Sequence, residues 1–502
     1  MPTGADPVVV ACDLSRTGTP LRHAWEHTIG SGHAPLALRA DYQAQLRRCH
    51  DELGVQHVRF HGLLSDDVGT LVCEDNALLD SFFNADVIWD ALLSMGVRPF
   101  VELSFMPSTL SSGAATVFHY RGNVTPPRDY AAWGGLIGRL ATHCVTRYGK
   151  DEVARWYFEV WNEPNLRAFW TGTQADYFEL YRYAAQAVKA ADPGLQVGGP
   201  ATAGNAWIPE FLEFCDRSHT PLDFVSTHHY PTDAFGQPGD DTEAQLAAST
   251  RSVLRDRARA TRAVVGRQPL YYTEWSTSSN ARDPLHDEPY AAPVIVKTML
   301  EARGLVDGYS WWAFSDIFEE NYFPSTPFHG GFGLLTLYGI AKPSYRAFQL
   351  LHGLGTELIL ALEDIHPTVD AWIDRQPGHR GVTVMLTNHA LPGHPIEAEH
   401  VDIRLVGASR PLAVTVRRID AEHANAKARW VALARPPSLD AEQVEDLHDV
   451  SRLAPLSQPW SYDAGVLHIE LDIPPHAVAA VTVDSATPAG PATGMEVRTP
   501  CP

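Results

Sequence analysis

The stretch Arg155-Trp-Tyr-Phe-Glu-Val-Trp-Asn-Glu-Pro164 begins as an aromatic and β-branched run and ends in a polar turn. Such a run is typical of a buried parallel strand. A second stretch, Gln268-Pro-Leu-Tyr-Tyr-Thr-Glu-Trp275, has the same form, and each places one glutamate, Glu163 or Glu274, beside a tryptophan where the strand ends. Because a buried carboxylate is costly unless it is used or paired, we interpret both glutamates as functional.

Strand-like and helix-like runs alternate on both sides of these stretches, which predicts parallel strands joined by helical crossovers. The expected strands span residues 27–30, 55–62, 97–104, 155–161, 195–201, 222–230, 269–275 and 308–315. Helices are expected between them, for example at 41–53 and 77–95. Eight such units predict a closed (β/α)8 TIM barrel, in which Glu163 and Glu274 end the fourth and seventh strands at the face where these barrels carry their chemistry.

Beyond residue 345 the sequence changes to short strand-like runs separated by Pro, Gly and Asp turns, which predicts a C-terminal antiparallel β-sandwich. A helix at 440–453 is expected to interrupt it. We expect a catalytic barrel at 16–345 and an accessory β-sandwich at 346–485. An N-terminal strand within 1–15 is expected to join the sandwich, and the Pro- and Gly-rich tail at 486–502 to be flexible.

The composition narrows the class of partner. The chain of 502 residues is 45% hydrophobic and 20% charged, as in a globular protein large enough for two domains. Its formal net charge of −21 speaks against nucleic acid as a partner and favours a neutral substrate. No stretch approaches the roughly 18 apolar residues of a membrane span, so no membrane partner is expected. The first residues lack the pattern of a secretory signal, which favours a cytoplasmic location without excluding the periplasm.

A pair of carboxyl groups is what the cleavage of a glycosidic bond requires. One protonates the leaving oxygen, while the other attacks or stabilises the anomeric carbon. The chain holds 60 acidic residues, most of which are expected to be solvated surface groups. Glu163 and Glu274 differ from those because they end apolar strands, so we predict that this pair is catalytic.

Motifs around the two glutamates resemble a known family. Trp161-Asn-Glu-Pro-Asn165 and Tyr272-Thr-Glu-Trp275 look like the acid/base and nucleophile signatures of the clan A glycoside hydrolases. Other motifs narrow the resemblance to family 39 and, within it, to bacterial β-xylosidases. In chain order they are Gly18-Thr-Pro-Leu21, Trp25-Glu26, Gly30-Ser-Gly32, Val58-Arg-Phe-His-Gly-Leu-Leu64, His228-His-Tyr230 and Trp311-Trp-Ala-Phe-Ser315. The resemblance covers residues 8–485 and implies a barrel followed by a β-sandwich.

The resemblance also implies roles for single residues. Glu163 becomes the acid/base and Glu274 the nucleophile of a retaining double displacement, with carboxyl groups about 5–5.5 Å apart. Asn162 is similar to an asparagine that hydrogen-bonds the sugar 2-hydroxyl. Tyr230 is expected to hold the carboxylate of the nucleophile, and His228 lies on the same strand face two residues earlier.

Further residues that match family site positions are expected to bind the sugar. His61 resembles a histidine that contacts a distal hydroxyl, and Arg59 points the same way and is expected to stabilise the charge of Glu274. Phe118 and Trp312 match apolar positions on which a pyranose ring can stack. Ordinary barrel packing is the alternative for these side chains.

Glu319 and Glu320 match a pair that binds the far hydroxyls of the terminal sugar. Two carboxylates bond well to neutral hydroxyls but repel a uronic acid, unless one of them is protonated or paired. The pair therefore favours a pentose such as xylose over iduronate. An exposed loop pair without a role in binding is the alternative.

The residues and the resemblance together predict a retaining, exo-acting β-xylosidase that releases terminal β-D-xylose from xylo-oligosaccharides or aryl β-xylosides without a metal or cofactor. Alternatives are α-L-iduronidase or α-L-arabinofuranosidase activity, or a carbohydrate-binding barrel without activity. Metal-dependent hydrolysis through His228 and His229 is disfavoured, because adjacent strand residues point to opposite faces. The six cysteines show no metal-ligand spacing, and the oligomeric state is left open.

Overall fold

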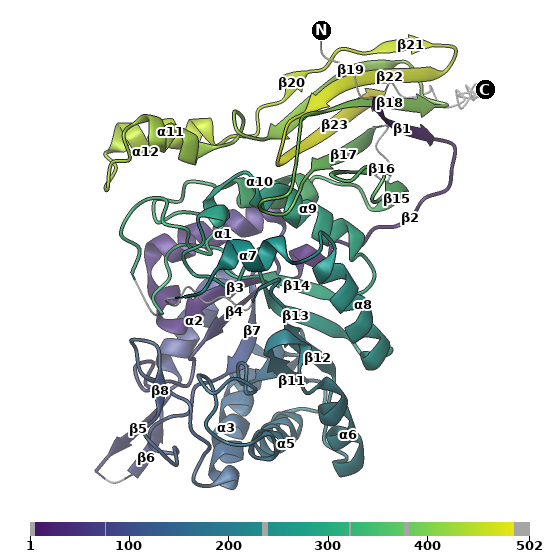
Figure 1. Ribbon diagram of the computed structural model, residues 1–502. Coiled ribbons are helices and arrows are strands. Elements are labelled where there is room, and N and C mark those ends of the chain that lie inside the picture. Colours follow the sequence, from purple (N-terminus) through teal and green to yellow (C-terminus); the bar gives the residue numbers. More distant parts are fainter. Residues whose placement is uncertain (1–5, 76, 233–238, 321–322, 376–380, 486–502) are drawn as a thin grey trace, which may run out of the picture.

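The computed structural model describes residues 6–75, 77–232, 239–320, 323–375 and 381–485. A closed barrel of eight parallel strands is surrounded by helices, and a β-sandwich packs against it (Figure 1). The predicted fold class is therefore confirmed. The limits assigned to the domains stay a prediction, and the expected flexible tail lies outside the described residues.

The barrel strands follow one another along the chain and close between the first and the last. They are β3 (Thr28–His33), β4 (His57–His61), β7 (Arg98–Leu103), β10 (Tyr157–Val160), β11 (Gln196–Thr202), β12 (Phe224–His228), β13 (Leu270–Trp275) and β14 (Gly308–Trp311). Closure runs through the parallel pairs Ser310–Thr28 and Trp311–Ile29. The strands are almost entirely buried, because their outer faces meet helices and their inner faces fill the barrel. All eight expected strands are present, with somewhat different ends.

Helices on the outside of the barrel connect the strands. They are α1 (Ala40–Leu53), α2 (Phe83–Ser94), α3 (Tyr130–Tyr148), α4 (Lys150–Val153), α5 (Gln174–Ala191), α6 (Ile208–Ser218), α7 (Thr242–Ala247), α8 (Val253–Val265), α9 (Ala291–Glu301) and α10 (Pro343–His352), with short 3-10 helices at Ala24–Glu26, Ala34–Leu38, Ala203–Asn205 and Pro284–Asp287. At the start of α5 the Thr173 hydroxyl accepts a hydrogen bond from the backbone N–H of Asp176, and the Asp176 carboxylate accepts one from the backbone N–H of Thr173, which forms a capping box. Among the described helices, none is both long and apolar enough to cross a bilayer.

One helix begins later than the sequence predicts. The expected helix at 77–95 divides into strand β6 (Ala77–Asp80), which pairs with β5 (Leu71–Glu74), and helix α2, which begins at Phe83. The prediction was wrong for the first residues because β5 offers backbone partners, and such a tertiary contact outweighs the helix propensity of Ala and Leu. A second small hairpin consists of β8 (Thr116–Val117) and β9 (Gly122–Asn123).

The sandwich consists of two sheets. The smaller has the order β1 (Val8–Asp13), β18 (Glu399–Val406), β22 (Val466–Ile473) and β21 (Ser461–Asp463). The larger has the order β2 (Thr19–Pro20), β15 (Glu357–Leu362), β16 (Val369–Arg375), β17 (Val382–Asn388), β23 (Ala477–Ser485), β19 (Pro411–Ile419) and β20 (Leu456–Ser457). Strand β1 runs parallel to β18, whereas the other pairings of the described sandwich strands are antiparallel. The beginning of the chain is thus tied to a strand of the C-terminal region.

Two helices interrupt the sandwich between β19 and β20. They are α11 (Ala426–Ala432) and α12 (Ala441–Val450). The second corresponds to the helix expected at 440–453. The first was not predicted, because seven residues are too few to show a helical period in the sequence.

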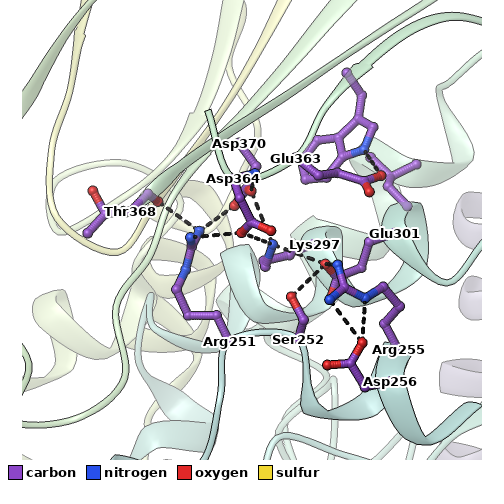
Figure 2. Close-up of polar contacts among 12 residues, drawn as sticks. Arg251, Ser252, Arg255, Asp256, Lys297, Glu301, Glu363, Asp364, Thr368 and Asp370 are labelled. Carbon is purple, nitrogen blue, oxygen red and sulfur yellow. Dashed lines mark hydrogen bonds and ion pairs between the residues drawn. The ribbon is translucent and has the colours of Figure 1, made fainter. Parts of the chain in front are cut away.

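Barrel and sandwich meet at a buried group of charges (Figure 2). Lys297 on α9 lies 3.0 Å from Glu301 of the same helix and 3.1 Å from Asp370 of β16. Arg251, just before α8, also pairs with Asp370, and Arg255 on α8 lies 3.3 Å from Glu301. We call these five residues the junction cluster. Each of its carboxylates contacts two cations, so the buried charges compensate one another.

Candidate active site

The two glutamates singled out in the sequence face each other at the carboxyl ends of the barrel strands. Glu163 follows β10, and Glu274 lies near the end of β13. One carboxylate oxygen of each and a ring nitrogen of His228, from β12, all lie within 4.8 Å of one another. The side chains of Glu163 and Glu274 keep 10% and 7% of their surface exposed, so both remain accessible to a small molecule.

The backbone around Glu163 has an unusual conformation. Trp161 and Glu163 have φ angles of 74° and 43°, in the left-handed region that residues other than glycine rarely adopt. Trp161 Nε1 donates to Phe169 O at 2.8 Å, and the Glu163 N–H donates to Ala201 O at 2.8 Å. Backbone strain of this kind, about 1–3 kcal/mol per residue, persists where surrounding contacts enforce it and clusters at functional sites. Here the strained positions flank Asn162.

Arg59, from β4, is fully buried and orients both Glu274 and Asn162. Its Nη1 donates to Glu274 Oε1 at 2.8 Å, and its Nη2 donates to Asn162 Oδ1 at 2.9 Å. The Tyr230 hydroxyl donates to Glu274 Oε2 at 3.0 Å. Burial, together with the charges of Glu274 and Glu163, raises the pKa of Tyr230 well above its ordinary value, so the hydroxyl keeps its proton. Both oxygens of Glu274 therefore accept a hydrogen bond, which fixes the carboxylate.

Two further buried carboxylates surround Arg59, and the sequence prediction missed them. Arg59 Nε donates to Glu159 Oε2 at 2.5 Å, and Nη2 lies 2.9 Å from Glu102 Oε2. Glu102 is also 2.7 Å from Nδ1 of His61. Both glutamates lie inside strands that the sequence predicted, so an acidic residue within an apolar strand was the available signal. The prediction used that signal only where a recognisable motif followed the strand.

Glu163 has the protonation behaviour of a general acid. Burial raises its pKa to about 7; the positive charges of His61 and Arg59 oppose this rise, and the negative charge of Glu102 adds to it. A carboxyl group with this pKa keeps its proton in a large fraction of molecules at neutral pH.

His228 contacts both carboxylates. Its Nδ1 is 2.9 Å from Glu163 Oε1 and 3.5 Å from Glu274 Oε2. Burial lowers the pKa of His228 to about 4, against the effect of the Glu274 charge, so the ring is neutral at neutral pH. These three residues are close enough together to ligate an ion, and His229 is not part of the group. Arg59 places a positive charge 2.8 Å from Glu274, which disfavours a cation there.

His61 and two aromatic rings lie beside the carboxylates. His61 Nε2 is 3.6 Å from Glu274 Oε1 and 3.8 Å from Glu320 Oε1. The rings of Trp312 and Phe118 lie with their centroids 4.7 and 6.1 Å from that of His61. Burial by itself would lower the pKa of His61, but the surrounding carboxylates raise it to about 9, so the imidazole is a cation at neutral pH. The structure therefore brings a cationic donor and apolar surface next to Glu274.

Glu319 and Glu320 were expected to act as a pair, and the structure separates them. Glu320 is buried beside His61; burial raises its pKa to about 8, with His61 opposing and Glu274 assisting the rise. The side chain of Glu319 is 32% exposed and pairs with Arg39 at 3.2 Å. Glu320 is thus largely protonated, and Glu319 is paired with a cation. Under these two conditions the carboxyl groups do not repel the carboxylate of a uronic acid. Charge at this pair no longer distinguishes a pentose from a uronate.

A TIM barrel that holds two facing carboxyl groups at its strand ends, one of them with a raised pKa, has the arrangement of a glycoside hydrolase. The family model described as glycosyl hydrolases family 39 matches residues 8–464. The chain therefore belongs to glycoside hydrolase family 39, as the motifs predicted, and is a glycosidase.

Individual relatives agree with this assignment. The chain is 47% identical over 464 residues to a β-xylosidase from Caldicellulosiruptor saccharolyticus, covering 91% of this chain and 95% of the relative. It is 36% identical over 476 residues to a β-xylosidase from Geobacillus stearothermophilus, covering 92% of each. Among solved structures, a family 39 β-xylosidase from Caulobacter crescentus has a TM-score of 0.80 at 33% identity, over 95% of this chain and 99% of that chain.

Proposed function

We propose that the chain is a retaining, exo-acting β-xylosidase that releases terminal β-D-xylose from xylo-oligosaccharides or aryl β-xylosides. The observation that carries the mechanism is the approach of Glu163 and Glu274, with one carboxylate oxygen of each within 4.8 Å of the other. Retaining glycosidases keep their carboxyl groups about 5–5.5 Å apart, whereas inverting ones need about 6.5–9.5 Å to leave room for a water. The proposed substrate rests on the two relatives named β-xylosidase.

In the first step Glu274 attacks the anomeric carbon while Glu163 gives its proton to the glycosidic oxygen. The bond to the leaving group breaks, the aglycone departs as an alcohol, and a xylosyl ester of Glu274 forms. The pKa of about 7 lets Glu163 carry this proton at neutral pH. Arg59 and Tyr230 hold the attacking carboxylate in place, so little reorganisation is needed at the moment of attack.

In the second step Glu163, now ionised, takes a proton from a water whose oxygen attacks the anomeric carbon. The ester bond breaks, Glu274 regains its charge, and xylose leaves with its original anomeric configuration. His228 suits both steps, because Nδ1 of a neutral imidazole can accept from the protonated Glu163 or donate to the ionised one, according to its tautomer. No step requires a metal or an organic cofactor.

The remaining residues bind the sugar in this proposal. Arg59 takes the amide oxygen of Asn162, so we expect the amide NH2 to donate to the 2-hydroxyl. His61 and the protonated Glu320 donate to other hydroxyls. The rings of Trp312 and Phe118 provide apolar surface for the faces of the pyranose. Glu319 binds a sugar hydroxyl only if it gives up its ion pair with Arg39.

One observation favours a second candidate, an α-L-iduronidase. The carboxylate of iduronate would meet a largely neutral Glu320 and a cationic His61 rather than two negative charges. Electrostatics at this position therefore tolerate a uronate, and the substrate has to be decided by assay.

The deciding experiment compares aryl β-xyloside, α-L-arabinofuranoside, α-L-iduronide and β-glucoside, with NMR of the first-formed sugar. We expect the highest kcat/KM for the β-xyloside, β-xylose as the first anomer, and activity that survives EDTA. Preference for the iduronide would replace the proposed substrate, and α-xylose as the first anomer would refute retention. Failure to cleave any of the four would favour a carbohydrate-binding barrel.

A further inference from the structure

A hollow of about 740 Å³ lies between the barrel and the sandwich. Helices α1 and α10 of the barrel provide one wall, and strands β17, β19 and β23 of the larger sandwich sheet provide another. His448 of α12 and the residues that follow this helix complete it. The residues assigned above to catalysis and sugar binding do not line this hollow. It is a separate feature of the molecule, and the proposed function leaves it unexplained.

The lining of the hollow is strongly basic. Arg48, Arg346, Arg417 and Arg452 line it together with one acidic residue, Glu52. The chain as a whole carries a net charge of −21, so this concentration of positive charge runs against the overall balance. Burial lowers the pKa of Arg346 to about 10, and the positive charges of Arg48 and Arg452 add to this effect. The arginines therefore repel one another. An anion in the hollow would relieve this repulsion.

Two of the four arginines are held by hydrogen bonds to backbone carbonyl groups. Arg48 donates through Nη1 to Gly339 O at 2.7 Å and through Nε to Glu52 at 2.9 Å. Arg346 donates through Nε to Ser451 O at 2.6 Å. Local structure alone could explain these two residues.

The other two arginines and the sheet face beside them are not explained in this way. Arg417, half-buried on β19, forms neither an ion pair nor a hydrogen bond with its side chain in the part of the chain that the structure describes. Arg452 is exposed and pairs with the nearby Asp449 at 2.8 Å. Thr383 and Thr482, opposite each other on β17 and β23, add hydroxyl groups to the same lining.

We propose that this hollow binds a small molecule that carries phosphate groups, either a phosphate ester or a free polyphosphate. Guanidinium groups match the oxygens of a phosphate with paired hydrogen bonds, and hydroxyl groups complete such a site. Four guanidinium charges exceed those of Glu52 in the lining and Asp449 beside Arg452, and this positive excess suits a multiply charged anion better than a single carboxylate. Because barrel and sandwich both line the hollow, a bound ligand stabilises their association, and with it the folded chain. The proposal does not depend on the substrate of the active site.

The test uses inorganic pyrophosphate as the probe and the full chain as the protein. Isothermal titration calorimetry should show saturable binding, and the Tm should rise by about 2 °C or more at saturation. Potassium chloride at equal ionic strength should give neither effect, and glucuronate should bind more weakly. Absence of saturable binding, or effects that potassium chloride reproduces, would overturn the proposal. Stronger binding of glucuronate would overturn the phosphate class.

Variants link the binding to the hollow. Arg417→Ala and Arg452→Ala should each weaken pyrophosphate binding about tenfold, and Arg417→Lys should weaken it less. Arg267→Ala removes an exposed arginine that lies after α8 and does not line the hollow, so it should bind like the unmodified chain. The kcat for an aryl β-xyloside should stay unchanged in Arg417→Ala, which also reports that this variant is folded. A dissociation constant that is the same in Arg417→Ala and Arg267→Ala would refute the assignment.

Discussion

The active centre and the junction cluster both bury charges, but they balance them differently. In the junction cluster, each carboxylate contacts two cations. The active centre holds one arginine and one histidinium against five carboxyl groups, namely Glu102, Glu159, Glu163, Glu274 and Glu320. Glu163 contacts no lysine or arginine among the described residues, and its pKa is raised to about 7. Matched charges hold two parts of the chain together, whereas burial without a paired cation keeps the proton on Glu163.

The strongest way to break the active centre is to remove Glu274, the proposed nucleophile. Glu274→Ala should lower kcat on an aryl β-xyloside by at least about 10⁴-fold, because no ester can form. Initial rates and the thermal unfolding curve should be measured together. Glu213→Ala, which removes an exposed glutamate of α6, is the control and should keep full activity. If Glu274→Ala were as active as this control, the assignment of the nucleophile would be wrong.

Removing Glu163, the proposed acid/base, should have a smaller effect that depends on the substrate. Glu163→Ala should slow cleavage of xylobiose by about 10²–10⁴-fold, but should slow the first step much less on aryl β-xylosides with good leaving groups. In the unmodified enzyme the acid is active while protonated, so kcat/KM should fall as the pH rises through about 7. This fall at alkaline pH should disappear when Glu163→Ala is assayed on an aryl β-xyloside with a good leaving group. Equal losses on both substrate types would contradict the role of Glu163.

The junction cluster should respond in stability rather than in activity. Lys297→Met leaves carboxylates of Glu301 and Asp370 without one of their cations, so the free energy of unfolding should fall by about 3–5 kcal/mol. Urea unfolding measures this loss, and kcat at 25 °C should change little. Lys189→Met removes a partly exposed lysine that pairs with Asp223 and should cost less than about 1 kcal/mol. If Lys297→Met lowered kcat without lowering the free energy of unfolding, the proposed difference between the junction cluster and the active centre would be wrong.

Much of the fold, and the pair of glutamates that face each other at the strand ends, could be predicted because their signals are local. The eight strands show as apolar runs, and Glu163 and Glu274 each lie within a few residues of a recognisable motif. The contacts around Arg59 are different, since its partners Glu102, Glu159 and Glu274 come from three other strands. Spacing along the chain does not tell which buried acids share one guanidinium group.

In the loop after β14, the sequence does not predict the contacts even of two neighbouring residues. Glu319 and Glu320 are neighbours in the sequence and were predicted to share one role. In the structure one pairs with Arg39 and the other lies beside His61, so the two side chains leave the loop in different directions. A motif can identify such residues as part of a site, but only the packing of the loop decides what each of them contacts.

The parallel pairing of β1 with β18 has a consequence for synthesis of the chain. Val8 leaves the ribosome long before its partner Val401 does. At about 5–20 residues per second, the interval is about 20–80 s. Throughout it the strand exposes apolar side chains and unpaired backbone groups that other chains or chaperones can bind. A circularly permuted gene in which these residues follow β23 would shorten the interval several-fold, and its yield of folded enzyme would show how much this timing matters to a cell.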